Sequence, residues 1–180
     1  AARRAGVSRR RLPGDLRLLR EVAARRDIRI RLLPFHPPGD VEAARHVRER
    51  LLAAESPPPA LAPDAVDIAT PGEHPEAMMQ EVAACDLLVG MRLHSLIYGA
   101  ARRVPLVGIS YDPKVDAFMS QLDAAPSCHT DRPDAAQLAA DISARLAEGP
   151  AWVEERKALL SRLHKESARP AQQICQFFRI

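Results

Sequence analysis

Short apolar runs alternate along the chain with longer stretches in which apolar residues recur every three or four positions. The apolar runs, which predict strands, are 28–35, 65–69, 85–90 and 104–110. The periodic stretches, which predict helices, are 14–26, 40–54, 75–84, 93–103, 113–122 and 134–147, with one or two C-terminal helices in 151–178 divided at Pro170. Strands separated by helices of about 10–15 residues are typical of βαβ units. The pattern therefore predicts an α/β fold with a doubly wound, Rossmann-like parallel sheet, in which Asp40 and Asp134 are N-caps.

The length of 180 residues fits a single domain over 1–180, and the start at Ala1 leads us to expect a fragment of a longer protein. No apolar run approaches the ~20 residues that span a bilayer. The three cysteines form no CxxC pair and no Cys/His ligand spacing. We therefore expect a cytoplasmic protein without a metal site.

Positive charge is concentrated at the start of the chain. The first 50 residues hold fourteen arginines against six acidic residues, although the whole chain carries a net charge of only +3. One interpretation is a non-enzymatic module that binds an anionic polymer. The other is a general preference for arginine over lysine. Aromatic residues make up only 4% of the chain, so no stacking platform for nucleic acid is expected.

Two ionisable side chains stand where the predicted strand 85–90 gives way to a helix. In "GMRLHSLIYGA", Arg92 and His94 flank Leu93, which belongs to the apolar face of that helix. Ligands of doubly wound folds collect beyond the carboxyl ends of the strands, and a helix N-terminus favours an anion. The pair therefore indicates an anion site. An arginine paired with a nearby carboxylate and a histidine bonded to a carbonyl would account for the same residues.

The next strand end repeats the arrangement. After 104–110, the segment "YDPK" places Lys114 in the first turn of a helix, and Asp112 either caps that helix or orients the lysine. His36, after the strand 28–35, is a weaker candidate for the same edge, and His46, His129 and His164 read as surface positions. Arg, His and Lys at neighbouring strand ends predict a phosphate or carboxylate pocket.

The segment 85–122, "CDLLVGMRLHSLIYGAARRVPLVGISYDPKVDAFMSQL", resembles the polysaccharide pyruvyl transferase family, in particular its CsaB-like cell-wall members. The Arg-Leu-His triplet and "GISYDPKV" carry the resemblance, and 28–50 resembles the family more loosely. The resemblance implies the C-terminal half of a two-domain enzyme of the GT-B type. It also implies transfer of a pyruvyl unit from phosphoenolpyruvate to two hydroxyls of one sugar, with phosphate released and no cofactor.

The resemblance further implies which residues act. Arg92, Leu93 (through its backbone), His94 and Lys114 bind phosphoenolpyruvate. Apart from the resemblance, the places of Asp112 and His36 after predicted strands make them further candidates for contact with the substrate, Asp112 through a substrate hydroxyl. The implied acceptor is a lipid-linked cell-wall glycan precursor, met in the cytoplasm at the inner face of the membrane. The N-terminal, acceptor-binding domain lies outside this sequence, so we expect the isolated fragment to bind donor poorly and to be inactive.

A glycosyltransferase of the GT-B type remains an alternative, because it would bind a nucleotide-sugar diphosphate at the same strand ends. Such a site usually offers an acidic residue to the base or ribose. Glu73 is the one poor candidate for that position.

Overall fold

The computed structural model describes residues 18–23, 28–53, 61–70 and 74–178, and the chain divides into two compact units. The first unit runs up to Pro71 and includes Asp134–Ala139, and the second comprises Gly72–Pro133 and Ala140–Ile180. The single domain expected over 1–180 stays a prediction.

The first unit is built on two parallel strands. β1 (Ile30–Leu32) pairs with β2 (Val66–Ile68), with Ile30 opposite Val66. Helix α2 (Gly39–Leu52) connects them, followed by the 3₁₀ turn η1 (Pro63–Ala65), and a further helix lies at 18–23. The apolar side of α2 contacts β2, where Leu51 and Val66 are fully buried. The unit is thus a small βαβ element with its own core.

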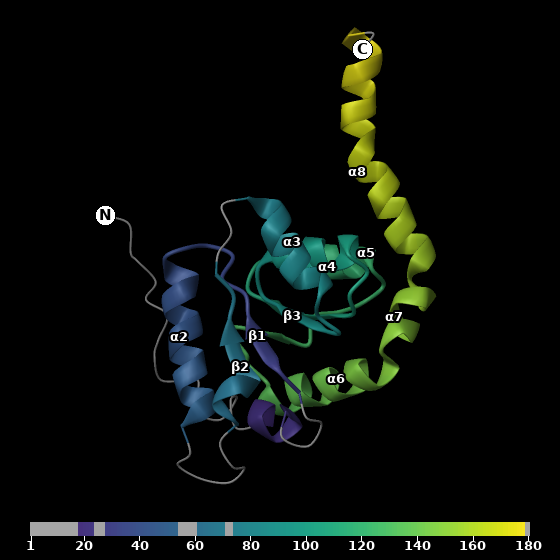
Figure 1. Cartoon of the computed structure of the whole chain (residues 1–180). Coiled ribbons are helices and arrows are strands. Elements are labelled where there is room, and N and C mark those ends of the chain that lie inside the picture. Colours follow the sequence, from purple (N-terminus) through teal and green to yellow (C-terminus); the bar gives the residue numbers. More distant parts are fainter. Residues whose placement is uncertain (1–17, 24–27, 54–60, 71–73, 179–180) are drawn as a thin grey trace, which may run out of the picture. The chain divides into compact units, whose positions relative to one another are not determined.

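The second unit contains a parallel sheet in the order β3-β4-β5, formed by Leu88–Gly90, Leu106–Ser110 and Cys128–His129. Helices α3 (Pro75–Ala83), α4 (Leu93–Ala101) and α5 (Pro113–Gln121) accompany these strands. α4 contacts both α3 and α5, so the three helices lie side by side against the sheet (Figure 1). Leu96, Leu106, Val115 and Met119 form much of the buried layer between helices and sheet.

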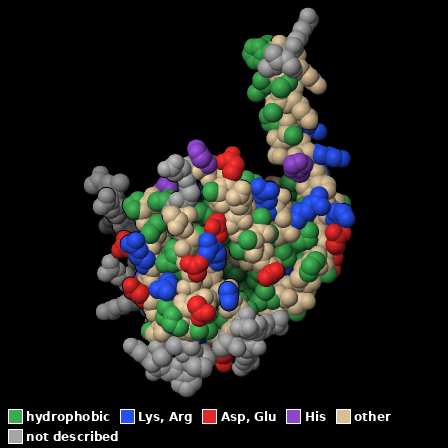
Figure 2. Space-filling view, in the orientation of Figure 1, with side chains coloured by type: hydrophobic (Ala, Val, Ile, Leu, Met, Phe, Trp, Pro, Cys, Tyr) green, Lys and Arg blue, Asp and Glu red, His purple; other side chains and the backbone are tan. Residues whose placement is uncertain are grey.

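Three further helices complete the chain: α6 (Ala135–Glu148), α7 (Pro150–Glu155) and α8 (Lys157–Phe178). The predicted break at Pro170 is wrong, because Pro170 lies inside α8. Proline removes one backbone N–H, but the alanines and glutamines beside it favour helix, so the helix continues. The far end of α8 extends away from the sheet of its unit and exposes Ile174, Phe177 and Phe178 (Figures 1 and 2).

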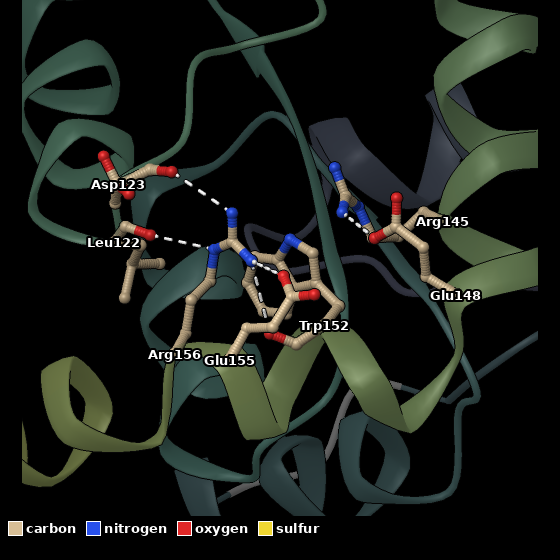
Figure 3. A network of polar contacts seen from close by, with 7 residues as sticks. All are labelled: Leu122, Asp123, Arg145, Glu148, Trp152, Glu155 and Arg156. Atoms are coloured by element: carbon tan, nitrogen blue, oxygen red, sulfur yellow. Dashed lines mark hydrogen bonds and ion pairs between the residues drawn. The ribbon is translucent and has the colours of Figure 1, made fainter.

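Trp152 of α7 anchors the C-terminal helices of the second unit. Its side chain is fully buried, and the guanidinium carbons of Arg145 and Arg156 lie 5.2 and 4.7 Å from its ring centroid. Arg156 also donates through Nε to the Leu122 carbonyl at 3.0 Å (Figure 3). α7 is thereby attached to the C-terminal end of α5, which is the end remote from Lys114.

The structure confirms parallel strands that alternate with helices, in the places expected from the sequence. It divides the described strands between two sheets and adds β5, which the sequence pattern did not predict. Asp134 caps α6 as predicted, since its Oδ1 accepts from Gln137 N at 2.9 Å. Asp40 is not an N-cap: α2 begins at Gly39, and the Asp40 carboxylate accepts instead from the His36 backbone N–H at 2.9 Å. The GT-B architecture stays a prediction.

Candidate functional site

Arg92 is the N-cap of α4, two residues after β3 ends. Its backbone is extended (φ −78°, ψ 131°), and its carbonyl accepts from Ser95 N at 3.0 Å and from Ser95 Oγ at 2.6 Å. Ser95 is buried, so this double contact fixes where the helix begins. A guanidinium carries no acceptor and cannot cap the helix N–H groups, and no side chain caps α4. The sequence thus leaves the first turn of α4 suited to an external anion.

Gly90 allows α4 to approach the end of β3 this closely. A Cβ atom at position 90 would lie 2.7 Å from Ser95 Oγ and 2.8 Å from Leu96 Cδ2. Leu96 is fully buried and cannot move away freely. The glycine at the strand end therefore sets the position of the first turn, which contains Leu93 and exposed His94.

Asp112 and Lys114 begin the next helix, directly after β4. Asp112 is the N-cap of α5: its Oδ1 accepts from Lys114 N at 3.0 Å, and its Oδ2 lies 3.4 Å from Lys114 Nζ. The backbone N–H of Lys114, joined by its ammonium group, lowers the pKa of Asp112 below the ordinary value. Lys114 Nζ also lies 5.8 Å from the centroid of the Tyr111 ring. Asp112 thus fills both of the roles considered for it, as cap and as partner of the lysine.

The two helix N-termini belong to the same edge of one sheet. β3 and β4 are adjacent and parallel, with Gly90 opposite Gly108, and α4 contacts α5. Because carboxyl ends of parallel strands meet at one edge, Arg92, His94 and Lys114 share that edge. Arg92 is half-buried, whereas the His94 and Lys114 side chains are exposed. The edge therefore brings Arg92, His94 and Lys114 next to two helix N-termini, with Asp112 paired to Lys114.

His36 lies in the first unit, in the bend between β1 and α2, with an exposed side chain. The other five predicted site residues lie in the second unit. The role of His36 therefore stays a prediction. Glu73 lies outside the described residues.

Ser110, Asp116 and His129 form a polar cluster at the same sheet edge that the sequence did not indicate. Ser110 Oγ donates to Asp116 Oδ2 at 2.7 Å, and His129 Nε2 lies 3.5 Å from Asp116 Oδ1. His129 was interpreted as a surface position, and its side chain is indeed 53% exposed. No local pattern joins positions 110 and 116 to position 129, because β5 is too short to read from the sequence. The cluster depends on the pairing of β4 with β5.

None of the helices in the described part of the chain is both long and apolar enough to cross a membrane. Within the same residues, no group of three or more His, Cys, Asp or Glu side chains is arranged to hold a metal ion.

Comparison with known proteins identifies one family. The family model described as polysaccharide pyruvyl transferase matches residues 1–113, which is 113 of the 180 residues. The match includes Arg92, Leu93, His94 and Asp112 and ends immediately before Lys114. No curated protein and no solved structure matches the chain.

Proposed function

Because the chain belongs to the polysaccharide pyruvyl transferase family, we propose that it binds phosphoenolpyruvate for transfer to a saccharide. In this proposal the pyruvyl unit becomes a cyclic ketal on two hydroxyls of one sugar residue, and phosphate is released. The chain is the donor-binding half of an enzyme of the GT-B type. Its acceptor is a lipid-linked cell-wall glycan precursor, met at the cytoplasmic face of the membrane.

The observation that carries the proposal is the edge of the β3-β4-β5 sheet at which β3 and β4 end. The two adjacent strands lead into helices whose N-terminal residues include Arg92, His94 and Lys114. An anion bound at this edge interacts with the cationic side chains and with the N–H groups in the first turn of α4 together.

Phosphoenolpyruvate offers two anionic groups to this edge, a phosphate and a carboxylate. The planar guanidinium of Arg92 can hold either group through two parallel hydrogen bonds, and the backbone N–H groups of Leu93 and His94 can add to them. Lys114 would face the phosphate as it leaves. Its present partner, Asp112, is an exposed carboxylate in an exposed ion pair, and such pairs are weak enough for a phosphate to displace them.

The reaction requires a proton on the methylene carbon of the donor and an exit for phosphate. His94 is exposed at the N-terminus of α4, and an imidazole exchanges protons near neutral pH. We assign to His94 the delivery of this proton, and to Arg92 and Lys114 the stabilisation of the departing phosphate. The scheme requires no cofactor.

Phosphate release and ketal formation by the full-length protein, supplied with phosphoenolpyruvate and a polysaccharide acceptor, test this proposal. We expect Arg92→Ala, His94→Ala and Lys114→Ala each to lose at least ~10²-fold in turnover while remaining folded by circular dichroism. Arg102→Ala is the matched control, because Arg102 is an exposed arginine at the opposite end of α4. Activity retained by all three site variants would remove the assignment.

Calorimetry separates this function from that of a glycosyltransferase. Uridine diphosphate carries a base and a ribose, which phosphoenolpyruvate lacks. We expect phosphoenolpyruvate to bind and uridine diphosphate not to compete with it. Preferential binding of uridine diphosphate would favour the glycosyltransferase instead.

A further inference from the structure

The Ser110, Asp116 and His129 cluster is not used by the donor-binding scheme. Ser110 is fully buried, and its hydroxyl donates to Asp116 Oδ2 at 2.7 Å. The second carboxylate oxygen, Oδ1, lies 3.5 Å from His129 Nε2. A buried hydroxyl thus holds one oxygen of a carboxylate whose other oxygen faces an imidazole.

Strand pairing fixes the position of the His129 backbone. Ser110 is the register partner of His129 in the parallel pair β4-β5, and Thr130 N donates to the Ser110 carbonyl at 2.8 Å. The His129 carbonyl in turn accepts from Arg132 N at 3.1 Å, which closes the turn after β5. Strand pairing therefore brings His129 to the same sheet edge as Lys114, which follows β4.

The order of the three groups decides what they can do. The Ser110 hydroxyl donates a hydrogen bond to Asp116 and is fully buried, so it is not placed to meet a substrate as a nucleophile. The Asp116 carboxylate faces Nε2 of His129 across 3.5 Å, which favours the tautomer protonated at Nε2 and leaves the lone pair on Nδ1. A half-exposed imidazole oriented in this way is suited to accept a proton from a substrate hydroxyl.

We propose that His129 is the general base that deprotonates an acceptor hydroxyl, with Asp116 and Ser110 as positioning residues. The inference rests on the proposed pyruvyl transfer. In that reaction two hydroxyls each form a C–O bond to carbon 2 of the donor and each lose a proton. Carbon 3 gains one proton, and the bond between carbon 2 and the bridging phosphate oxygen breaks as phosphate leaves with its electron pair. The second hydroxyl proton leaves through His129 to phosphate or solvent.

In this assignment the two histidines that transfer protons lie after or at the end of the two outer strands of the sheet. His94 follows β3 and supplies a proton, whereas His129 ends β5 and removes one, with Lys114 after the central strand. The charged groups on the elements around His129 are Asp112, Lys114 and Asp116 at the start of α5, and Asp131 and Arg132 in the turn after β5. Asp116 is the one among them with an ion-pair contact to the imidazole.

The test measures kcat, the KM for phosphoenolpyruvate and the pH profile of phosphate release by the full-length protein with a polysaccharide acceptor. We expect His129→Gln to lower kcat by ~10²–10⁴-fold with KM for the donor unchanged, and to abolish the acidic limb of the kcat profile. Asp116→Asn should lower kcat less, with the KM for the donor unchanged, because the imidazole loses the carboxylate that orients it. A purely structural role for Asp116 would change kcat and KM together. His164→Gln, an exposed histidine of α8, is the matched control and should leave all three quantities unchanged.

Calorimetric binding of phosphoenolpyruvate separates the two proposals. Wild-type turnover with unchanged kcat and pH profile in His129→Gln and Asp116→Asn would overturn the inference and leave the proposed function standing. Wild-type protein that neither binds phosphoenolpyruvate nor releases phosphate would overturn the proposed function, and the inference with it. Loss of donor binding in His129→Gln would also overturn the inference, since it would make His129 a donor contact.

Discussion

Replacement of Arg156 should strongly lower the stability of the second unit. Its Nε donates to the Leu122 carbonyl at 3.0 Å, its guanidinium reaches the Asp123 carbonyl at 3.3 Å, and it stacks 4.7 Å from the Trp152 ring centroid (Figure 3). These contacts join α7 to the C-terminal end of α5. Replacing Arg156 by alanine removes all of them at once.

The magnitude follows from the burial of these contacts. The Arg156 side chain is only 17% exposed, so its hydrogen bond to the Leu122 carbonyl is a charge-assisted one of about 1.5–3 kcal/mol. The stacking on Trp152 adds about 0.5–2 kcal/mol. The Glu155 carboxylate, 71% exposed, adds little. We therefore expect Arg156→Ala to lower the free energy of unfolding by ~2–5 kcal/mol.

Urea unfolding measures this directly, because Trp152 is the one tryptophan of the chain and reports on its own burial by fluorescence. Arg156→Lys should lose about half as much free energy, since an ammonium keeps the charge but cannot span two carbonyls and the ring. Arg162→Ala, which removes an exposed arginine of α8, should stay within about 0.5 kcal/mol of wild type. A loss below ~1 kcal/mol in Arg156→Ala would refute the reasoning.

Three further changes test other parts of the account. Gly90→Ala places a methyl group 2.7 Å from Ser95 Oγ, so it should cost about 1–3 kcal/mol in urea unfolding and weaken phosphoenolpyruvate binding. Asp134→Ala removes the N-cap of α6 and should cost about 0.5–2 kcal/mol by the same measurement. Asp112→Asn keeps a capping oxygen but loses the charge that attracts Lys114. The pKa of Asp112 is lowered from 3.8, so wild type should melt higher than this variant above pH 3.8, and the difference should disappear as the pH falls through the lowered pKa.

The order of strands and helices and the positions of Arg92, His94 and Lys114 were predictable for the same physical reason. Buried parallel strands are apolar throughout, and their helices are periodic, so β3, α4, β4 and α5 all lie where the pattern placed them. Arg92, His94 and Lys114 stand immediately after such strands. Their shared edge follows from topology, with no need for contacts distant in sequence.

Other features depend on contacts that the local pattern does not encode. β5 is two residues long, so its pairing with β4, and with it the Asp116–His129 contact, could not be foreseen. Asp40 has the sequence context of a cap, but α2 begins one residue earlier and its carboxylate turns back to His36. In both cases a tertiary or turn contact outweighs a local preference.

Titration calorimetry of phosphoenolpyruvate with the full-length protein tests the central claim most directly, with wild type, Arg92→Ala and the control Arg102→Ala at one ionic strength. The account predicts that wild type and Arg102→Ala bind the donor alike. Arg92→Ala should bind it ~10²-fold more weakly, which corresponds to the loss of about 3 kcal/mol of charge-assisted hydrogen bonding. Equal affinity in all three proteins, or no binding by wild type, would contradict the claim that this sheet edge holds the donor.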